Sequence, residues 1–491
     1  MESLADELWD VVINGTGLQQ SLLALALSRS DKKILHLDHN EFYGGPAAAF
    51  TLAEAEAWAA ENAAADNGSK KLFHKAIFTK AEGADDVLGA ARSYALTLSP
   101  QILYCRSELV NQLVSSRAFR SLEFLAVGSF FIYEPGKDGA KPSLVKLPST
   151  REDIFLTTAI PAKAKRGMMK FLKLVMDYDS EENKSIWEPK AGNLLSDFLA
   201  STFKLDASLQ SFVTALTLSL DGKITVKDGI LAISRHMDSM GVFGPGFSAV
   251  YPKFGGLSEV IQASCRACAV GGAVYILGTG VNSIKAIDED GANVEITITS
   301  DIAVKTRSFV TDHNTAEGKR VTSKLIAVID SKPEGIFGAA IEGGQQPAVA
   351  IVAFPAKSLC LEQEYPVYAM LHSGETGECP LSQCVAYLSS IAYPASKSIL
   401  DQALASLLSA LSTQDSTPKP LVQLYYEQAD GVSSLSIDGS VVTMPCASSD
   451  LAFNDDLLGL VQDAWTSLTK GDEKAGEYMK FVDREPVEDD E

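Results

Sequence analysis

The stretch from Trp9 to Gln20, Trp-Asp-Val-Val-Ile-Asn-Gly-Thr-Gly-Leu-Gln-Gln, constrains the fold of this chain more than any other. An apolar strand leads into a turn that contains Gly15 and Gly17, and an apolar helix from Leu18 to Leu27 follows. This order is typical of a dinucleotide-binding turn. A second apolar strand at residues 34–37 completes the pattern, so the sequence predicts a β-α-β unit with parallel strands.

One departure weakens the cofactor prediction. In a working Gly-x-Gly-x-x-Gly turn, the first two glycines let the backbone approach a pyrophosphate and the third lets the helix pack against the strand. Here Gln20 stands at the third position, and we expect its side chain to push the helix outward. Asp38 ends the second strand, where a ribose hydroxyl would be held. We therefore expect the fold without a bound cofactor; the alternative is a plain β-α-β unit that never bound a nucleotide.

The distribution of strand and helix patterns divides the chain. A length of 491 residues suggests two to four domains. From Pro148 to about Met240 apolar residues recur at helical spacing, and strand patterns return after residue 241. The predicted architecture is a discontinuous α/β domain at 1–148 and 241–491, interrupted by an all-helical domain at 149–240. The acidic end at 483–491 is expected to be a solvated tail.

Charge and cysteine usage exclude several classes of protein. With 42 basic against 63 acidic residues the net charge is −21, which repels nucleic acid. No run approaches the roughly 18 apolar residues of a membrane span, and no signal peptide is indicated. Seven scattered cysteines favour a reducing compartment, so we expect a cytoplasmic protein. The pair Cys265 and Cys268 lacks the further ligands of a zinc site, so no metal is expected.

The sequence offers no recognisable catalytic group. The six histidines are dispersed along the chain, and no Gly-x-Ser-x-Gly motif occurs. We therefore expect no catalytic residues.

A family resemblance rests on several segments together. These are the first unit, Phe42-Tyr43-Gly44-Gly45, the helical insert, and the segment from Phe254 to Arg266. Together they resemble the family of Rab GDP-dissociation inhibitors and Rab escort proteins. The resemblance covers most of the first 280 residues and implies a flavoprotein-like Rossmann-type fold with mixed sheets, used as a lipid-protein chaperone.

The resemblance implies a platform for the GDP form of a Rab GTPase, with contacts at Tyr43, Glu259 and Arg266. Glu259 and Arg266 are two helical turns apart, so both side chains can face one partner. Spacing alone favours the alternative, an exposed ion pair or two separate solvated charges, and the motif resemblance favours contact with the partner. Tyr43 could also be a half-buried turn residue.

The escort branch of this family also presents its cargo to Rab geranylgeranyl transferase, through a phenylalanine and an arginine eleven residues later. Phe155 and Arg166 have that spacing. The resemblance therefore implies docking of the transferase alpha subunit, with Phe155 as an exposed anchor and Arg166 pairing with a carboxylate. A core phenylalanine and a solvated arginine are the alternative.

The resemblance implies two further binding regions. The residues from Ile102 to Val114 would hold the Rab C-terminal tail, through apolar contacts with Leu109 and Leu113. The helical insert would cover a geranylgeranyl lipid, since apolar burial is favourable by roughly 25 cal/mol per Å². The candidate lining residues, most of which would equally serve as domain core, are Phe171, Leu172, Val175 and Phe212.

Three functions follow as hypotheses. The first is a non-catalytic escort that binds GDP-bound Rab, docks the transferase and associates transiently with membranes. The second is a flavin-dependent oxidoreductase, against which Gln20 and the bulky Phe42-Tyr43 pair speak. The third is an inhibitor that recycles prenylated Rab without serving the transferase, and only Phe155 and Arg166 argue against it.

Overall fold

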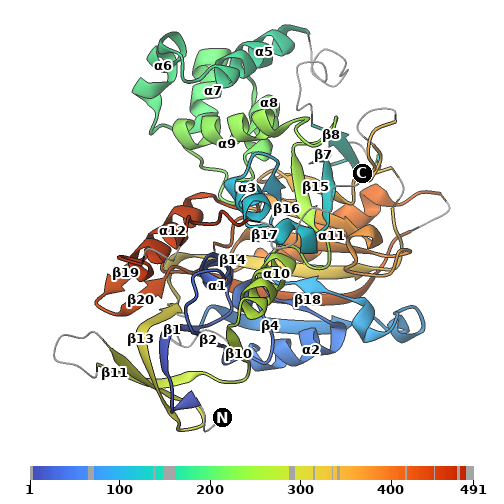
Figure 1. Ribbon diagram of the computed structural model, residues 1–491. Coiled ribbons are helices and arrows are strands. Elements are labelled where there is room, and N and C mark those ends of the chain that lie inside the picture. Colours follow the sequence, from blue (N-terminus) through green and yellow to red (C-terminus); the bar gives the residue numbers. More distant parts are fainter. Residues whose placement is uncertain are drawn as a thin grey trace, which may run out of the picture.

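The computed structural model describes residues 4–64, 71–136, 140–147, 162–286, 293–312, 316–333, 335–339, 343–414, 417–446, 448–472 and 476–482. In these ranges two large sheets and their helices form an α/β body, and a group of helices stands at one end of it (Figure 1). The mixed α/β fold predicted from the sequence is confirmed.

The first large sheet contains the predicted β-α-β unit. β1 and β2 pair in parallel, with Val11 opposite Ile34, and β13 pairs in parallel on the other side of β1. In the described chain its strands, in spatial order, are β10 (Val274–Ile276), β2 (Ile34–Leu37), β1 (Leu8–Asn14), β13 (Ala303–Asp312), β12 (Val294–Ile298) and β11 (Val281–Ala286). β20 (Val441–Met444) pairs with β13 and with β19 (Ser436–Asp438).

Three helices pack together on this part of the body. α1 (Leu18–Leu27) is buried along its whole length, which agrees with a sequence that has apolar residues on most sides of the helix. It packs against α10 (Leu257–Val270) and α12 (Asp456–Leu468), and α3 (Glu108–Ser115) shares their apolar cluster. This arrangement places the start of α1 and one side of α10 near each other.

The second large sheet is mainly antiparallel. In the described chain its order is β4 (Phe73–Lys80), β18 (Pro420–Gly431), β14 (Ala316–Ile329), β17 (Cys384–Ile391), β16 (Val367–Ser373), β15 (Val349–Phe354), β7 (Phe124–Glu134), β9 (Ala249–Pro252) and β6 (Leu103–Tyr104). β8 (Ser143–Lys146) pairs with β7 in antiparallel orientation. α11 (Ser396–Leu411) covers one face. α2 (Leu52–Glu61) and the short pair β3 (Ala49–Phe50) and β5 (Leu96–Thr97) complete the body.

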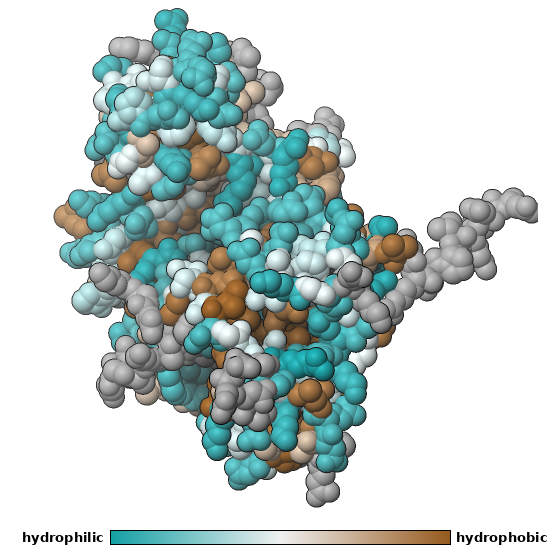
Figure 2. Space-filling view, turned by 60° about the vertical axis from the view of Figure 1, so that its left-hand side comes forward, coloured by the Kyte–Doolittle hydropathy of each residue, from teal (hydrophilic) through white to brown (hydrophobic). Residues whose placement is uncertain are grey.

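Residues 162–239 form helices, drawn in green at the top of Figure 1. They are α5 (Ala162–Met176), α6 (Glu181–Trp187), α7 (Leu195–Phe203), α8 (Ala207–Leu216) and α9 (Val226–Ser239). Their buried side chains join one apolar cluster with the second sheet. In the space-filling view, much of their surface is hydrophilic and apolar groups gather lower on the same face (Figure 2). None of the helices in the described ranges is long and apolar enough to cross a membrane.

Candidate functional site

Protein side chains fill the space over the glycine turn. Gly15 has φ +94°, a left-handed conformation that favours glycine. A Cβ atom on Gly17 would lie 2.7 Å from Gln20 Oε1, and one on Gly15 would lie 3.2 Å from Asp312 Oδ2. Gln20 Nε2 donates a hydrogen bond of 2.7 Å to Asp312 Oδ2. The expectation that Gln20 pushes the helix outward is therefore corrected: its side chain folds back over the turn, because Asp312 provides a partner there.

Asp38 serves the protein itself. Its Oδ2 accepts hydrogen bonds from the Thr16 backbone N–H at 2.7 Å and from the Thr16 hydroxyl at 2.6 Å. Its Oδ1 accepts from the Asn40 backbone N–H at 2.8 Å. The Gly44 backbone N–H donates to Thr16 Oγ1 at 3.0 Å. These bonds tie the loop after β2 to the glycine turn and so position Tyr43, which precedes Gly44.

The buried carboxyl of Asp312 is expected to make the stability of this turn depend on pH. Burial raises the pKa of its carboxyl to about 6, although the hydrogen bond from Gln20 opposes this. The pKa of Asp312 is higher in the folded than in the unfolded state. The ionised carboxylate therefore lowers the free energy of unfolding above about pH 6, and this destabilisation decreases as the pH falls from about 6 to 4. We expect Asp312→Asn to raise the free energy of unfolding by about 1–2 kcal/mol at pH 7 and by much less at pH 4.

Urea unfolding of both proteins at the two pH values measures this difference. The matched control is Asp10→Asn, which replaces a carboxylate on the neighbouring strand β1 and should change the free energy of unfolding very little. An equal effect of Asp312→Asn at pH 4 and pH 7 would contradict the predicted raised pKa.

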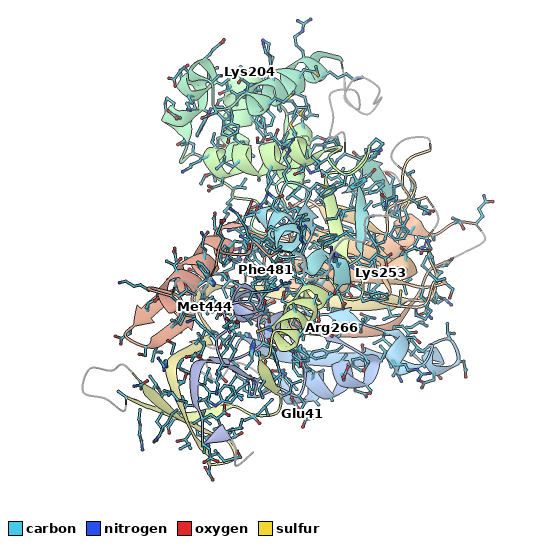
Figure 3. The ribbon with its side chains drawn as sticks, viewed as in Figure 1. Glu41, Lys204, Lys253, Arg266, Met444 and Phe481 are labelled. Atoms are coloured by element: carbon cyan, nitrogen blue, oxygen red, sulfur yellow. The ribbon has the colours of Figure 1, made fainter. Side chains whose placement is uncertain are left out.

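The residues expected to contact Rab meet in one hollow. Tyr43, Glu259 and Arg266 all line a depression of about 390 Å³ beside α10. Figure 3 shows Arg266 on this helix. Three other residues with polar side chains line it that are not among the predicted contacts: Ser121, Gln262 and Tyr275.

The helical spacing could have revealed one of the missed residues. Glu259, Gln262 and Arg266 follow the i, i+3, i+7 positions of one helical stripe. Ser121 and Tyr275 come from other segments, which tertiary contacts bring to α10. No comparable spacing signal exists for them.

The hollow presents separate charged groups. Within the described residues, Glu259 and Arg266 form no ion pair, so the alternative of an internal Glu259–Arg266 pair is not observed. Arg266 is exposed, and burial raises the pKa of the half-buried Glu259 carboxyl. Tyr43 is half-buried, and its ring centroid lies 6.3 Å from that of Tyr275. A charged arginine, a carboxylate and a tyrosine hydroxyl are thus available to one partner.

Two buried cysteines lie at this surface: Cys265 contributes to the lining of the hollow, and Cys268 follows it on α10. Burial raises the pKa of Cys265 to about 11 and that of Cys268 to about 12. Both thiols therefore stay protonated at neutral pH, which makes them poor nucleophiles and poor metal ligands. Groups of three or more metal-ligating side chains are absent from the described ranges.

A family model described as GDP dissociation inhibitor matches residues 5–411. The chain belongs to the GDP dissociation inhibitor family. A Saccharomyces cerevisiae relative, "Rab proteins geranylgeranyltransferase component A", is 30% identical over 415 residues, which cover 83% of this chain and 66% of the yeast protein. The chain therefore spans slightly less than two thirds of that relative.

Solved structures support the fold. The Rab GDI of Plasmodium falciparum has a TM-score of 0.67 at 19% identity, covering 94% of this chain and 98% of the other. An oxidoreductase from Methanosarcina mazei has a TM-score of 0.59 at 13% identity, covering 93% and 99%. The expected flavoprotein-like architecture is confirmed.

A dinucleotide placed as a Gly-x-Gly-x-x-Gly turn would hold it does not fit the residues at this turn. The Gln20 carboxamide lies where the backbone would approach a pyrophosphate, and the Asp312 carboxylate adds negative charge beside it. Asp38 already accepts hydrogen bonds from Thr16 and Asn40. The side chains of this family member thus occupy the phosphate and ribose positions of the turn.

The residues expected to dock the transferase are only partly described. Phe155 lies outside the described residues. Arg166 is exposed on α5, and Lys170 and Lys173 are exposed on the same helix. Because these positions are four and three residues apart, the three side chains share one face.

The residues expected to hold the lipid and the Rab tail are buried. Phe171, Leu172, Val175 and Phe212 are core residues of the helical elements. Three of them, all except Val175, line a cavity of about 10 Å³, close to the space of one water molecule. Leu109 and Leu113 are likewise buried, on the inner side of α3. A lipid or a peptide could reach these side chains only after neighbouring groups move.

Proposed function

We propose that this chain is a Rab escort protein. It binds newly made GDP-bound Rab GTPase, presents it to Rab geranylgeranyl transferase and delivers the prenylated Rab to membranes. The observation that carries this proposal is the shared hollow of Tyr43, Glu259 and Arg266, three residues that the family resemblance assigns to Rab contact. The name of the yeast relative, a component of Rab geranylgeranyltransferase, supports the escort branch.

The proposed mechanism is positioning, without chemistry by this chain. A Rab held on the platform keeps its cysteine-bearing tail near a docked transferase, which raises the effective concentration of the tail. The escort is a cytoplasmic, non-catalytic protein without a cofactor that contacts membranes transiently. After transfer, the helices α5–α9 part to cover the geranylgeranyl group with residues such as Phe171 and Phe212.

The transferase alpha subunit docks on the exposed face of α5 and on Phe155. Arg166, Lys170 and Lys173 lie on this face, and α5 contains no acidic residue. An acidic surface on the transferase would complement these charges, and the association would weaken as salt screens them.

Replacing Phe155 and Arg166 together with alanine should abolish transferase binding while leaving Rab binding intact. The pair supplies an aromatic anchor and a bidentate cation, the two residue types that dominate small interfaces. Pull-down of the ternary complex measures the effect, and Lys204→Ala, in an exposed residue of the α7–α8 turn, is the control. Formation of a normal ternary complex by the double variant would refute the docking assignment.

An in vitro prenylation assay tests the function itself. Transferase, lipid donor and GDP-bound Rab are combined with and without this chain, and geranylgeranylation should require the chain. If prenylation is no better with the chain than without it, the recycling inhibitor is favoured, since the Plasmodium falciparum Rab GDI has the same fold. A stoichiometric flavin spectrum of the purified protein would instead favour the oxidoreductase.

A further inference from the structure

Residues 476–482 lie along α3, the helix that the family resemblance assigns to the Rab tail. The Phe481 backbone N–H donates to Ser115 O at 3.0 Å, and the Tyr478 hydroxyl donates to Gln112 Oε1 at 3.5 Å. Gln112 and Ser115 are three residues apart and so mark one side of the helix. Phe481 is labelled in Figure 3, beside this helix.

Aromatic and cationic contacts hold the segment on its other side. The ring centroids of Tyr478 and Trp465 of α12 lie 5.5 Å apart. The Arg29 guanidinium, just after α1, lies 5.1 Å from the Phe481 ring centroid and donates to Val482 O at 2.9 Å. Residues of α3 and α12 and Arg29, just after α1, therefore form one peptide-sized binding site for residues 476–482, called the seat below.

A methionine anchors the segment in the core beneath. The Met479 side chain is 1% exposed and belongs to the same buried apolar cluster as Leu109 and Leu113. The predicted tail-binding residues and the chain's own segment thus share one apolar environment. The methionine side chain is flexible and fits irregular surroundings, so it can pack in this site and can also be displaced from it.

The segment has the features of a cover that can be displaced. It forms no strand or helix, and within the described ranges a single backbone hydrogen bond joins it to α3. Met479 has φ +55°, a left-handed conformation that is unfavourable for a side chain of this size. Segments with few backbone hydrogen bonds and local strain open more readily than core elements.

We propose that residues 476–482 occupy the seat of the Rab C-terminal tail and act as an intramolecular competitor for it. The proposal rests on the proposed function, because it takes the tail of a bound Rab as the displacing ligand. The seat fits an extended peptide with apolar or aromatic side chains at the positions of Met479 and Phe481. A Rab whose tail fits poorly would leave the cover in place and bind less tightly.

The test uses the full chain and two forms of one GDP-bound Rab, with and without its C-terminal tail. Tyr478→Ala combined with Phe481→Ala removes the two ring contacts, that of Tyr478 with Trp465 and that of Phe481 with the Arg29 guanidinium, and leaves the Arg29 hydrogen bond to Val482 O. If residues 476–482 occupy the seat in most molecules, only a small fraction of the wild-type chains can accept the Rab tail. The apparent affinity for the tailed Rab is then lower in proportion to that fraction. We expect the double variant to bind the tailed Rab about tenfold more tightly and the tail-less Rab unchanged.

Lys480→Ala, in an exposed residue of the same segment, is the matched control and should change neither affinity. Should the double variant fold poorly, Arg29→Gln weakens the cover from outside the core and should shift affinity in the same direction. Equal affinities of the wild type and the variants for the tailed Rab would overturn the inference while leaving the proposed function intact. Failure of both Rab forms to bind the wild-type chain would overturn both.

Discussion

Arg266→Ala is expected to weaken binding of a GDP-bound Rab at least about thirtyfold. The guanidinium is exposed, lines the same hollow as Tyr43 and Glu259, and has no ion-pair partner among the described residues. Arginine at the centre of an interface commonly contributes about 2 kcal/mol or more, and 1.4 kcal/mol corresponds to a factor of ten. Because the exposed Arg266 side chain forms no hydrogen bond or ion pair within the described ranges, the fold should be unaffected.

Isothermal titration with one purified Rab measures the effect. Arg307→Ala is the matched control, since Arg307 is an exposed arginine on β13 whose surface ion pair with Asp10 contributes little. The thermal unfolding midpoint of both variants should equal that of the wild type. Retention of wild-type affinity by Arg266→Ala would sink the assignment of this hollow to Rab.

Glu378→Ala should destabilise the fold by about 3–5 kcal/mol. The carboxylate is fully buried and accepts hydrogen bonds of 2.7 Å from the Tyr251 and Tyr387 hydroxyls. His372 Nδ1 lies 2.7 Å from Oε2 as well. Removing the carboxylate leaves up to three buried polar groups without a partner, and each costs about 1–3 kcal/mol.

The same hydrogen-bond network lies next to the start of α10, the helix that contains Glu259 and Arg266. A Cβ atom on Gly256 would lie 2.5 Å from the Tyr251 hydroxyl oxygen, so this tyrosine packs directly against the residue that precedes α10. Gly256 has φ +64°, which is favourable only for glycine. Loss of Glu378 should therefore loosen the start of α10 and reduce Rab affinity in addition to stability.

Urea unfolding at neutral pH gives the free energy change. Glu375→Ala, three residues away, is the matched control because its carboxylate is exposed and pairs only distantly, at 3.8 Å, with Lys332. Glu378→Gln should lie between the wild type and alanine, since an amide oxygen still accepts hydrogen bonds. A Glu378→Ala change no larger than that of the control would contradict the structural role.

The local elements near the first strand followed from pattern alone. The predicted helix Leu18–Leu27 and strand Ile34–Leu37 coincide with α1 and β2, because apolar runs bounded by glycine and polar residues specify short buried elements. The pair Glu259 and Arg266 was placed on one side of a helix by its spacing, and both do line one hollow.

Other features depended on contacts between distant segments. Gln20 was expected to displace a helix, but Asp312, 292 residues later, accepts its amide and turns it over the glycine turn. Leu109 and Leu113 suggested an apolar contact surface, but no local pattern indicates that Met479 joins their cluster. The Glu378 network likewise joins β9, β16 and β17 in a way that sequence spacing does not encode.

The sequence by itself determined the β-α-β unit, the degenerate glycine turn and the charged stripe of α10, because each depends on residues within one or two turns or strands. Only the tertiary structure decided what fills the turn, which side chains surround Arg266 and what covers α3. Those outcomes depend on hydrogen bonds and packing between residues hundreds of positions apart, and their partners are chosen by the way the sheets and helices pack.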